Sequence, residues 1–266
     1  MFIPFEYLRK VMILLVPLML ISCGTIATKK TETPEPLRIG INPTYPPLIF
    51  KQDETITGAE IAMAREMARA LDKDPVFVEL IFDQLIRNLL DGQIDIIMSG
   101  MSITDARKMR IVFSEQYLKT GQMALMRYAQ SRRYNSPESI KSSDARIGVQ
   151  DGTTGDIFVQ KYCPEAGRIS IKKPGDAMSY FRGNRIDIFI YDAPAILWIA
   201  SQNEAKVVPL WKLLTKEQLA FGLRRQDGEL LTSVNRVLAE WKSSGKLNSI
   251  LERWIPCSDR VQKCEE

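Results

Sequence analysis

Short apolar segments alternate with amphipathic ones along the chain, which is typical of an α/β protein. Three segments have the length and the branched apolar side chains of buried strands: residues 37–42, 76–80 and 94–98. Two segments between them carry apolar side chains at helical spacing: residues 58–71 and 83–92. Asp83 stands where a side chain can cap the second helix. This order of elements predicts a parallel sheet with helices packed on it.

The pattern begins again in the second half of the chain. Residues 146–149 (Arg-Ile-Gly-Val) repeat residues 38–41 (Arg-Ile-Gly-Ile), and the stretch around Asp187 repeats the stretch around Asp95. Both aspartates stand at the start of strands, so we assign them to structure. Two similar α/β units are therefore expected, each with polar turns at the carboxyl ends of its strands, where ligands bind in such sheets.

A turn of small polar residues follows residues 94–98. It contains Ser99, Gly100 and Ser102, whose hydroxyls and backbone groups are available to a ligand. Arg107 comes next, and its planar guanidinium matches a carboxylate in bidentate fashion. The turn therefore predicts a site for a small carboxylate, although an arginine after a turn is also a common surface ion-pair partner.

The last third of the chain predicts a strand followed by two amphipathic helices, at residues 219–224, 227–244 and 246–254. We expect these elements to return to the first unit. The chain then crosses between the units twice, near residues 117–121 and 218–221, and two such connections make a hinge.

Composition excludes several classes of function. The 266 residues include no histidine, so histidine-based catalysis and histidine metal sites are excluded, and no cofactor or metal is expected. The formal charge of +4, without a basic run, indicates neither nucleic acid nor an anionic membrane surface as a partner.

The N-terminal segment resembles a bacterial lipoprotein signal. Two basic residues precede an apolar run at residues 11–21, which is the size of a signal-peptide core. The run ends in Leu-Ile-Ser-Cys, where Cys23 is the expected site of lipidation and membrane anchoring. Cleavage without lipidation is the alternative. Three further cysteines, Cys163, Cys257 and Cys264, leave the disulfide pairing open.

Nearly all of the chain after this segment resembles the polar amino-acid-binding proteins of bacterial ABC importers, solute-binding protein family 3. The stretches that carry the resemblance are residues 39–47, 89–95, 99–104 with Arg107, 113–114 with Tyr117, 149–155, 186–187 and Asp192. The resemblance implies a two-lobed periplasmic binding protein-like (Venus flytrap) α/β fold with two hinge crossings. The implied boundaries are a signal peptide at 1–22, a lipidated cysteine and tether at 23–36, lobe 1 at 37–116 and 222–256, the hinge at 117–121 and 218–221, lobe 2 at 122–217, and a tail at 257–266.

The resemblance also implies a site for a free amino acid. Arg107 binds the carboxylate from one lobe and Asp192 binds the ammonium group from the other. The further contacts implied are Ser102 and Thr154 for the carboxylate, Gly100 and Ser99 for the ammonium group, and Tyr45 and Phe82 beside the side chain. Each has a structural alternative: Asp192 is also placed to cap a helix, and aromatic residues next to turns commonly pack in a core.

Two departures from the family pattern bear on the ligand. Asn42 stands where many members have an aspartate that contacts the ligand side chain, and Gln150 in the facing turn is also neutral. These residues favour a neutral polar amino acid over arginine or lysine.

The expected function is that of an exported, lipid-anchored monomer on the periplasmic side, which delivers an amino acid to an ABC permease in the inner membrane. Three alternatives stay open: a dehydratase acting on prephenate- or arogenate-like acids, an amino-acid sensor, and an interaction protein that has lost its ligand.

Overall fold

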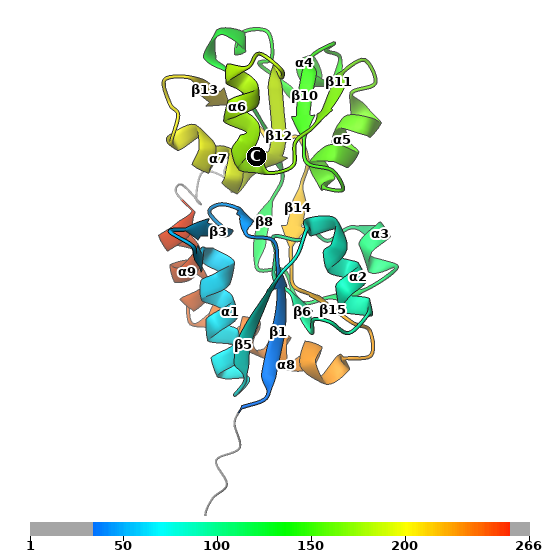
Figure 1. The fold of residues 1–266 in the computed structure, drawn as a ribbon, viewed down its shortest axis with the longest axis vertical. Coiled ribbons are helices and arrows are strands. Elements are labelled where there is room, and N and C mark those ends of the chain that lie inside the picture. Colours follow the sequence, from blue (N-terminus) through cyan, green and yellow to red (C-terminus); the bar gives the residue numbers. More distant parts are fainter. Residues whose placement is uncertain (1–33, 256–266) are drawn as a thin grey trace, which may run out of the picture. The chain divides into compact units, whose positions relative to one another are not determined.

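Two α/β lobes make up the part of the chain that the computed structural model describes, residues 34–255 (Figure 1). Lobe 1 is built on a five-stranded sheet with the order β5-β1-β6-β15-β7. Its strands are β1 (Pro36–Ile41), β5 (Asp74–Glu79), β6 (Ile96–Ile97), β7 (Val112–Phe113) and β15 (Gly222–Leu223). The first three are parallel, and β15 runs antiparallel to β6 and β7. The returning segment therefore completes the sheet of lobe 1.

Lobe 2 repeats this plan with the sheet order β11-β10-β12-β9-β13. Its strands are β9 (Gln122–Arg127), β10 (Arg146–Val149), β11 (Gly167–Ser170), β12 (Ile188–Asp192) and β13 (Val207–Pro209). The parallel trio β11-β10-β12 corresponds to β5-β1-β6, with Gly40 opposite Ile97 in one lobe and Gly148 opposite Phe189 in the other. The predicted repeat and the two-lobed α/β fold are confirmed.

Two smaller sheets complete the strand pairing. The antiparallel pair β8 (Leu118–Thr120) and β14 (Glu217–Leu219) carries the two chain crossings between the lobes. A three-stranded sheet of β2 (Thr44–Tyr45), β3 (Ile49–Gln52) and β4 (Thr55–Thr57) extends lobe 1.

Helices cover both faces of each sheet because the strand side chains alternate between two apolar clusters. Ile96 packs in a cluster with α1 (Ala59–Ala70), α8 (Gly228–Ser243) and α9 (Lys246–Trp254), whereas Ile97 packs with α2 (Leu85–Leu90). In lobe 2, the neighbouring side chains of Ile188 and Phe189 likewise belong to different apolar clusters. The helices of lobe 1 are α1 (Ala59–Ala70), α2 (Leu85–Leu90), α3 (Asp105–Lys108), α8 (Gly228–Ser243) and α9 (Lys246–Trp254). Those of lobe 2 are α4 (Pro137–Lys141), α5 (Thr154–Tyr162), α6 (Ala177–Arg182) and α7 (Ala193–Ser201).

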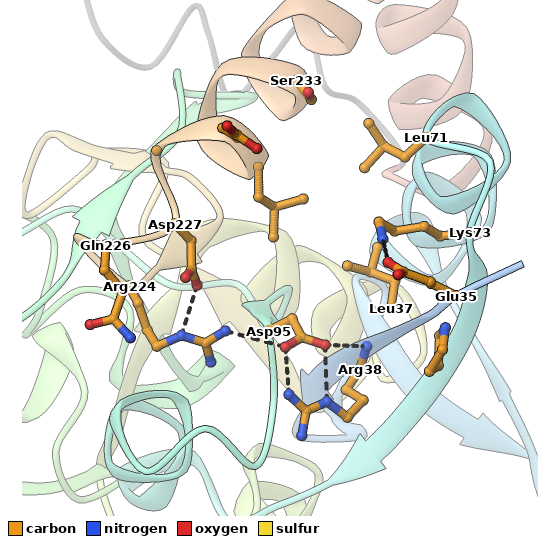
Figure 2. A pocket seen from close by; sticks show the side chains of 14 residues that line it. Glu35, Leu37, Arg38, Leu71, Lys73, Asp95, Arg224, Gln226, Asp227 and Ser233 are labelled. Atoms are coloured by element: carbon orange, nitrogen blue, oxygen red, sulfur yellow. Dashed lines mark hydrogen bonds and ion pairs between the residues drawn. The ribbon is translucent and has the colours of Figure 1, made fainter.

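Ion pairs hold the starts of the strands together. In lobe 1, Asp95 accepts hydrogen bonds from Arg38 at 2.6 Å and from Arg224 at 3.2 Å, beside a surface cavity of about 1270 Å³ (Figure 2). Burial alone would raise the pKa of Asp95, but the bonds from Arg38 and Arg224 lower it. Asp187 pairs in the same way with Arg146 at 2.8 Å in lobe 2. The structural assignment of both aspartates is confirmed.

Two local predictions are wrong. Residues 219–224 do not form one strand, because the chain leaves β14 at Leu219 and joins the lobe 1 sheet in β15. Asp83 makes no cap, because a 3₁₀ turn at Phe82–Gln84 precedes α2 and places Gln84 at its N-cap.

Several predictions from the sequence concern residues outside the described part of the chain. The signal peptide, Cys23, most of the tether, Cys257 and Cys264 all lie there, whereas Cys163 is a free, buried thiol in lobe 2. No helix within residues 34–255 has the length and apolar character needed to cross a membrane.

Candidate functional site

Arg107 and Asp192 line the same small cavity, one from each lobe. Arg107 lies on α3, which begins after Thr104, whose hydroxyl accepts a hydrogen bond from the Arg107 backbone N–H at 3.2 Å. Asp192 ends β12 and precedes α7. The cavity has a volume of about 10 Å³, room for about one water molecule. Its lining residues are Phe82, Gly100, Ser102, Arg107, Thr153, Thr154, Tyr191 and Asp192.

The Arg107 guanidinium is bound by neutral groups. It donates to the Ser102 carbonyl at 2.8 Å and, across the cleft, to the Gly152 carbonyl at 3.3 Å. Its guanidinium carbon lies 5.4 Å from the centre of the Phe82 ring, in cation–π contact. Burial lowers the pKa of Arg107, while the negative charges of Asp192 and Glu217 raise it. The positive charge is therefore held in place for an anion.

The Asp192 carboxylate faces the cleft and not the helix that follows it. It makes no hydrogen bond with the backbone of α7, although it occupies the N-cap position. Instead it accepts a hydrogen bond from the Tyr45 hydroxyl at 2.7 Å and another from the Gln122 amide. Burial, and then the nearby charge of Glu217, raise the pKa of Asp192 to about 7. This carboxylate is placed to hold a cation.

Gly100 forms the floor of the cavity, and a second buried carboxylate supports it from below. The Gly100 φ is +61°, and a Cβ there would lie 2.4 Å from the Tyr45 ring, so only glycine fits. Its N–H donates to Glu60 at 2.6 Å, and Glu60 also accepts from the Tyr117 hydroxyl at 2.6 Å. Burial raises the pKa of Glu60 to about 7, although these two hydrogen bonds lower it.

We expect a Glu60→Gln variant to change the pH dependence of stability. Since the pKa of Glu60 is about 7 and its ordinary value is 4.5, the folded chain retains a proton that the unfolded chain releases in this range. The contribution of Glu60 to the free energy of unfolding is then complete below about pH 4.5 and is lost as the pH rises through about 7. The difference between the two pKa values corresponds to roughly 3 kcal/mol.

Urea unfolding at about pH 5 and about pH 8 measures this change. The free energy of unfolding of the original chain minus that of Glu60→Gln should be about 2 kcal/mol smaller at the higher pH than at the lower pH. Glu54→Gln, at an exposed position, serves as the control. A constant difference across the range would contradict the prediction.

Sequence analysis missed Thr153 and Tyr191, which line the cavity, and two residues that bond to its lining, Glu217 and Gln122. Glu217 accepts hydrogen bonds from the Ser102 hydroxyl at 2.6 Å and the Thr154 hydroxyl at 2.8 Å. Gln122 donates to Asp192 and, at 2.9 Å, to Thr154. A signal existed for Gln122, which is the one polar residue at the start of the apolar strand β9, whereas the polar segment around Glu217 gives none.

Four of the predicted site residues lie outside the lining of this cavity. Tyr45 contacts it through Asp192, and the Ser99 hydroxyl instead accepts the Asn42 backbone N–H at 2.9 Å. Asn42 and Gln150 line a neighbouring chamber of about 680 Å³, to which Phe82 also contributes. The structure therefore brings together Arg107, Asp192, Ser102, Gly100, Thr154 and Phe82.

This arrangement suits a small molecule with an anionic and a cationic group. Arg107 offers a fixed positive charge from lobe 1, and Asp192 offers a negative one from lobe 2. Because the two groups belong to different lobes, one ligand reaches both only when the lobes are close together.

Comparisons with known proteins show the family of the chain. Residues 37–256 match the family model of bacterial extracellular solute-binding proteins, family 3. The histidine-binding periplasmic protein of Escherichia coli (strain K12) is 28% identical over 232 residues, which cover 84% of this chain and 88% of that protein. The L-cystine-binding protein TcyJ of the same strain is 24% identical, covering 82% of each chain.

Solved structures give the same picture. A mutant of ArgBP from T. maritima has a TM-score of 0.77 and 33% identity, covering 82% of this chain and 94% of that one. A putative binding component of an ABC transporter from Wolinella succinogenes, complexed with lysine, has a TM-score of 0.79 and 26% identity. The match covers 85% of this chain and 98% of that one. An ancestral amino acid-binding protein, described as a precursor of cyclohexadienyl dehydratase, has a TM-score of 0.76 and 31% identity, covering 83% and 95%. The chain belongs to the bacterial extracellular solute-binding proteins of family 3.

Proposed function

We propose that this protein captures a free polar amino acid between its two lobes and delivers it to an ABC permease. The observation that carries the proposal is the pairing of Arg107 from lobe 1 and Asp192 from lobe 2 in one cavity. A free α-amino acid carries both complementary charges on groups bonded to the same carbon, so we propose that its carboxylate pairs with Arg107 and its ammonium group with Asp192. Both contacts form only in the closed state, and this differential affinity drives closure.

Entry of the ligand requires the lobes to separate. A cavity of about 10 Å³ is smaller than an amino acid, so the lobes lie closer together in the described conformation than they would around a bound ligand. The crossings β8 and β14 are the hinge of this movement. We retain segments 117–121 and 218–221 as the hinge and 122–217 as the lobe that moves against the rest.

The ligand side chain extends past Phe82 into the neighbouring chamber of about 680 Å³. Two neutral amides there, Asn42 and Gln150, already bond to the protein: Asn42 donates to the Leu80 carbonyl at 2.9 Å, and Gln150 donates to the Lys172 carbonyl at 3.1 Å. These amides favour a neutral polar side chain near them, although the lining of the chamber also includes charged residues of both signs, among them Glu79, Asp83 and Lys172. Relatives that bind arginine, lysine, histidine and cystine define the panel of competing ligands.

Thermal-shift screening against the free amino acids, followed by calorimetric titration of the best one, tests the proposal. We expect one class of polar amino acid to raise the melting temperature and to bind without being consumed. Incubation with prephenate and arogenate is included in the same series. Formation of product from either acid would replace the receptor function with that of a dehydratase, and absence of any stabilisation would reject ligand capture.

The periplasmic names of its relatives support an exported protein, and we propose a lipid anchor at Cys23. This cysteine lies outside the described residues, so the proposal rests on the sequence: the basic residues, the apolar run and the Leu-Ile-Ser-Cys that ends it. A Cys23→Ser chain is expected to leave the membrane fraction. Retention in that fraction would argue against the anchor.

A further inference from the structure

Glu217 connects the hinge to both lobes at the edge of the ligand cavity. It lies on β14, one of the two strands that cross between the lobes. One oxygen of its carboxylate, Oε2, accepts the hydroxyl hydrogens of Ser102 in lobe 1 and Thr154 in lobe 2, at 2.6 and 2.8 Å. The other oxygen, Oε1, accepts from Thr215, two residues before it in the chain, at 2.6 Å. A single side chain at the first residue of β14, next to the hinge segment 218–221, thus holds groups from both lobes.

The carboxylate lies behind these hydroxyls with respect to the cavity. Ser102 and Thr154 line the cavity, but Glu217 does not. It therefore acts on a ligand through the two hydroxyls. Each hydroxyl has one hydrogen and gives it to Glu217, so the orientation of both oxygen atoms is fixed from the hinge side.

The network continues from Glu217 to the second charged group of the site. The Thr154 hydroxyl also accepts from the Gln122 amide at 2.9 Å, and the same amide donates to Asp192. The Gln122 backbone N–H in turn donates to the Thr215 hydroxyl at 2.8 Å. The hinge strand, the cleft hydroxyls and the ammonium site are therefore parts of one hydrogen-bond network.

We propose that Glu217 is a positioning residue for ligand binding, which fixes Ser102 and Thr154 across the cleft and so couples the hinge to the closed site. The affinity part of this inference rests on the proposed function. Its conformational part does not, because it concerns only the bonds between Glu217 and the two lobes. Charge-assisted hydrogen bonds are among the stronger contacts a side chain makes, so their loss should open the cleft.

The first test measures hydrogen–deuterium exchange of the full chain without ligand. In Glu217→Gln, the amide that replaces the carboxylate keeps its shape but lacks the negative charge that attracts the Ser102 and Thr154 hydroxyls. We expect exchange to become about tenfold faster in peptides covering residues 99–107 and 150–156, one from each lobe. The matched control is Glu115→Gln, which removes an exposed partner of Lys242 near the same hinge. Unchanged exchange in either peptide, or an equal change in the control, overturns the coupling.

The second test measures affinity by calorimetry for the amino acid that stabilises the original chain most. Glu217→Gln should bind it about 10- to 100-fold more weakly, and Glu217→Asp, whose shorter side chain cannot reach both hydroxyls, should show a similar loss. Because Thr154 is one of the residues that Glu217 fixes, adding Thr154→Val to Glu217→Gln should weaken binding by less than about threefold more. The positioning role would be overturned if the affinity losses of Glu217→Gln and Thr154→Val multiplied in the double variant. It would also be overturned if Glu217→Asp bound the ligand with the affinity of the original chain.

These two tests separate this inference from the proposed function. An original chain that binds no amino acid rejects the proposed function, while the exchange measurement still decides the role of Glu217. A Glu217→Gln chain that does not fold is recognised by its circular dichroism, and Glu217→Asp then provides both measurements.

Discussion

Replacing Arg107 with glutamine is expected to lower the affinity for the amino acid about 1000-fold, roughly 4 kcal/mol. Arg107 is the positive group that lines the cavity, and its neighbours there include the carboxylates of Asp192 and, behind the hydroxyls, Glu217. Without the guanidinium, a ligand carboxylate would be desolvated next to these negative charges. Calorimetric titration of the variant measures the loss.

Two further variants make this result specific. Arg107→Lys keeps the charge but loses the planar fork, so its affinity should fall between those of the original chain and Arg107→Gln. Arg110→Gln, at an exposed position two residues after the end of α3, is the matched control and should bind normally. If Arg107→Gln binds within tenfold of the original chain, the carboxylate is held elsewhere.

Asp192→Asn is expected to weaken binding about 100-fold, because the amide keeps the shape of the carboxylate but cannot pair with an ammonium group. The loss should depend on that group of the ligand. A ligand analogue lacking the α-amino group should bind the original chain and Asp192→Asn with nearly equal, low affinity. Asp176→Asn, at an exposed position in lobe 2, is the control.

The raised pKa of Asp192 gives this site a pH dependence of known sign. Only the ionised carboxylate pairs with an ammonium group, and the pKa of Asp192 is about 7 as a result of burial and of the Glu217 charge. Affinity should therefore fall by up to about tenfold for each pH unit below about 7 and level off above it. Asp192→Asn should lose this dependence. An affinity of the original chain that stays constant from about pH 5 to about pH 8 would show that Asp192 does not hold the ammonium group.

Much of the fold could be predicted because it depends on local patterns and on one repeat. The Arg-Ile-Gly strands became β1 and β10, and the helices at residues 227–244 and 246–254 became α8 and α9. The change of sheet inside residues 219–224 could not be predicted, since an apolar run looks the same in one sheet as in two. The 3₁₀ turn before α2 was missed because a single turn has no periodicity of its own.

Part of the candidate site could likewise be predicted from the sequence, and part could not. Arg107 follows and Asp192 ends an apolar strand segment, each at the edge of a polar stretch that the sequence displays. Glu217 could not be found, because its partners Ser102 and Thr154 are 115 and 63 residues away and its neighbours in sequence are polar. Such long-range hydrogen bonds follow from the tertiary fold and leave no local pattern. The roles of all the predicted site residues at the ligand, Arg107 and Asp192 included, remain predictions.

The strand order of lobe 1 has a consequence for how the protein is made. Strand β15, at Gly222–Leu223, lies between β6 and β7, whereas every strand of the lobe 2 sheet lies between residues 122 and 209. During synthesis from the N-terminus, lobe 2 can therefore complete its sheet first, and β6 keeps an unpaired edge until nearly the whole chain has emerged. The half that begins the chain is the last to finish folding.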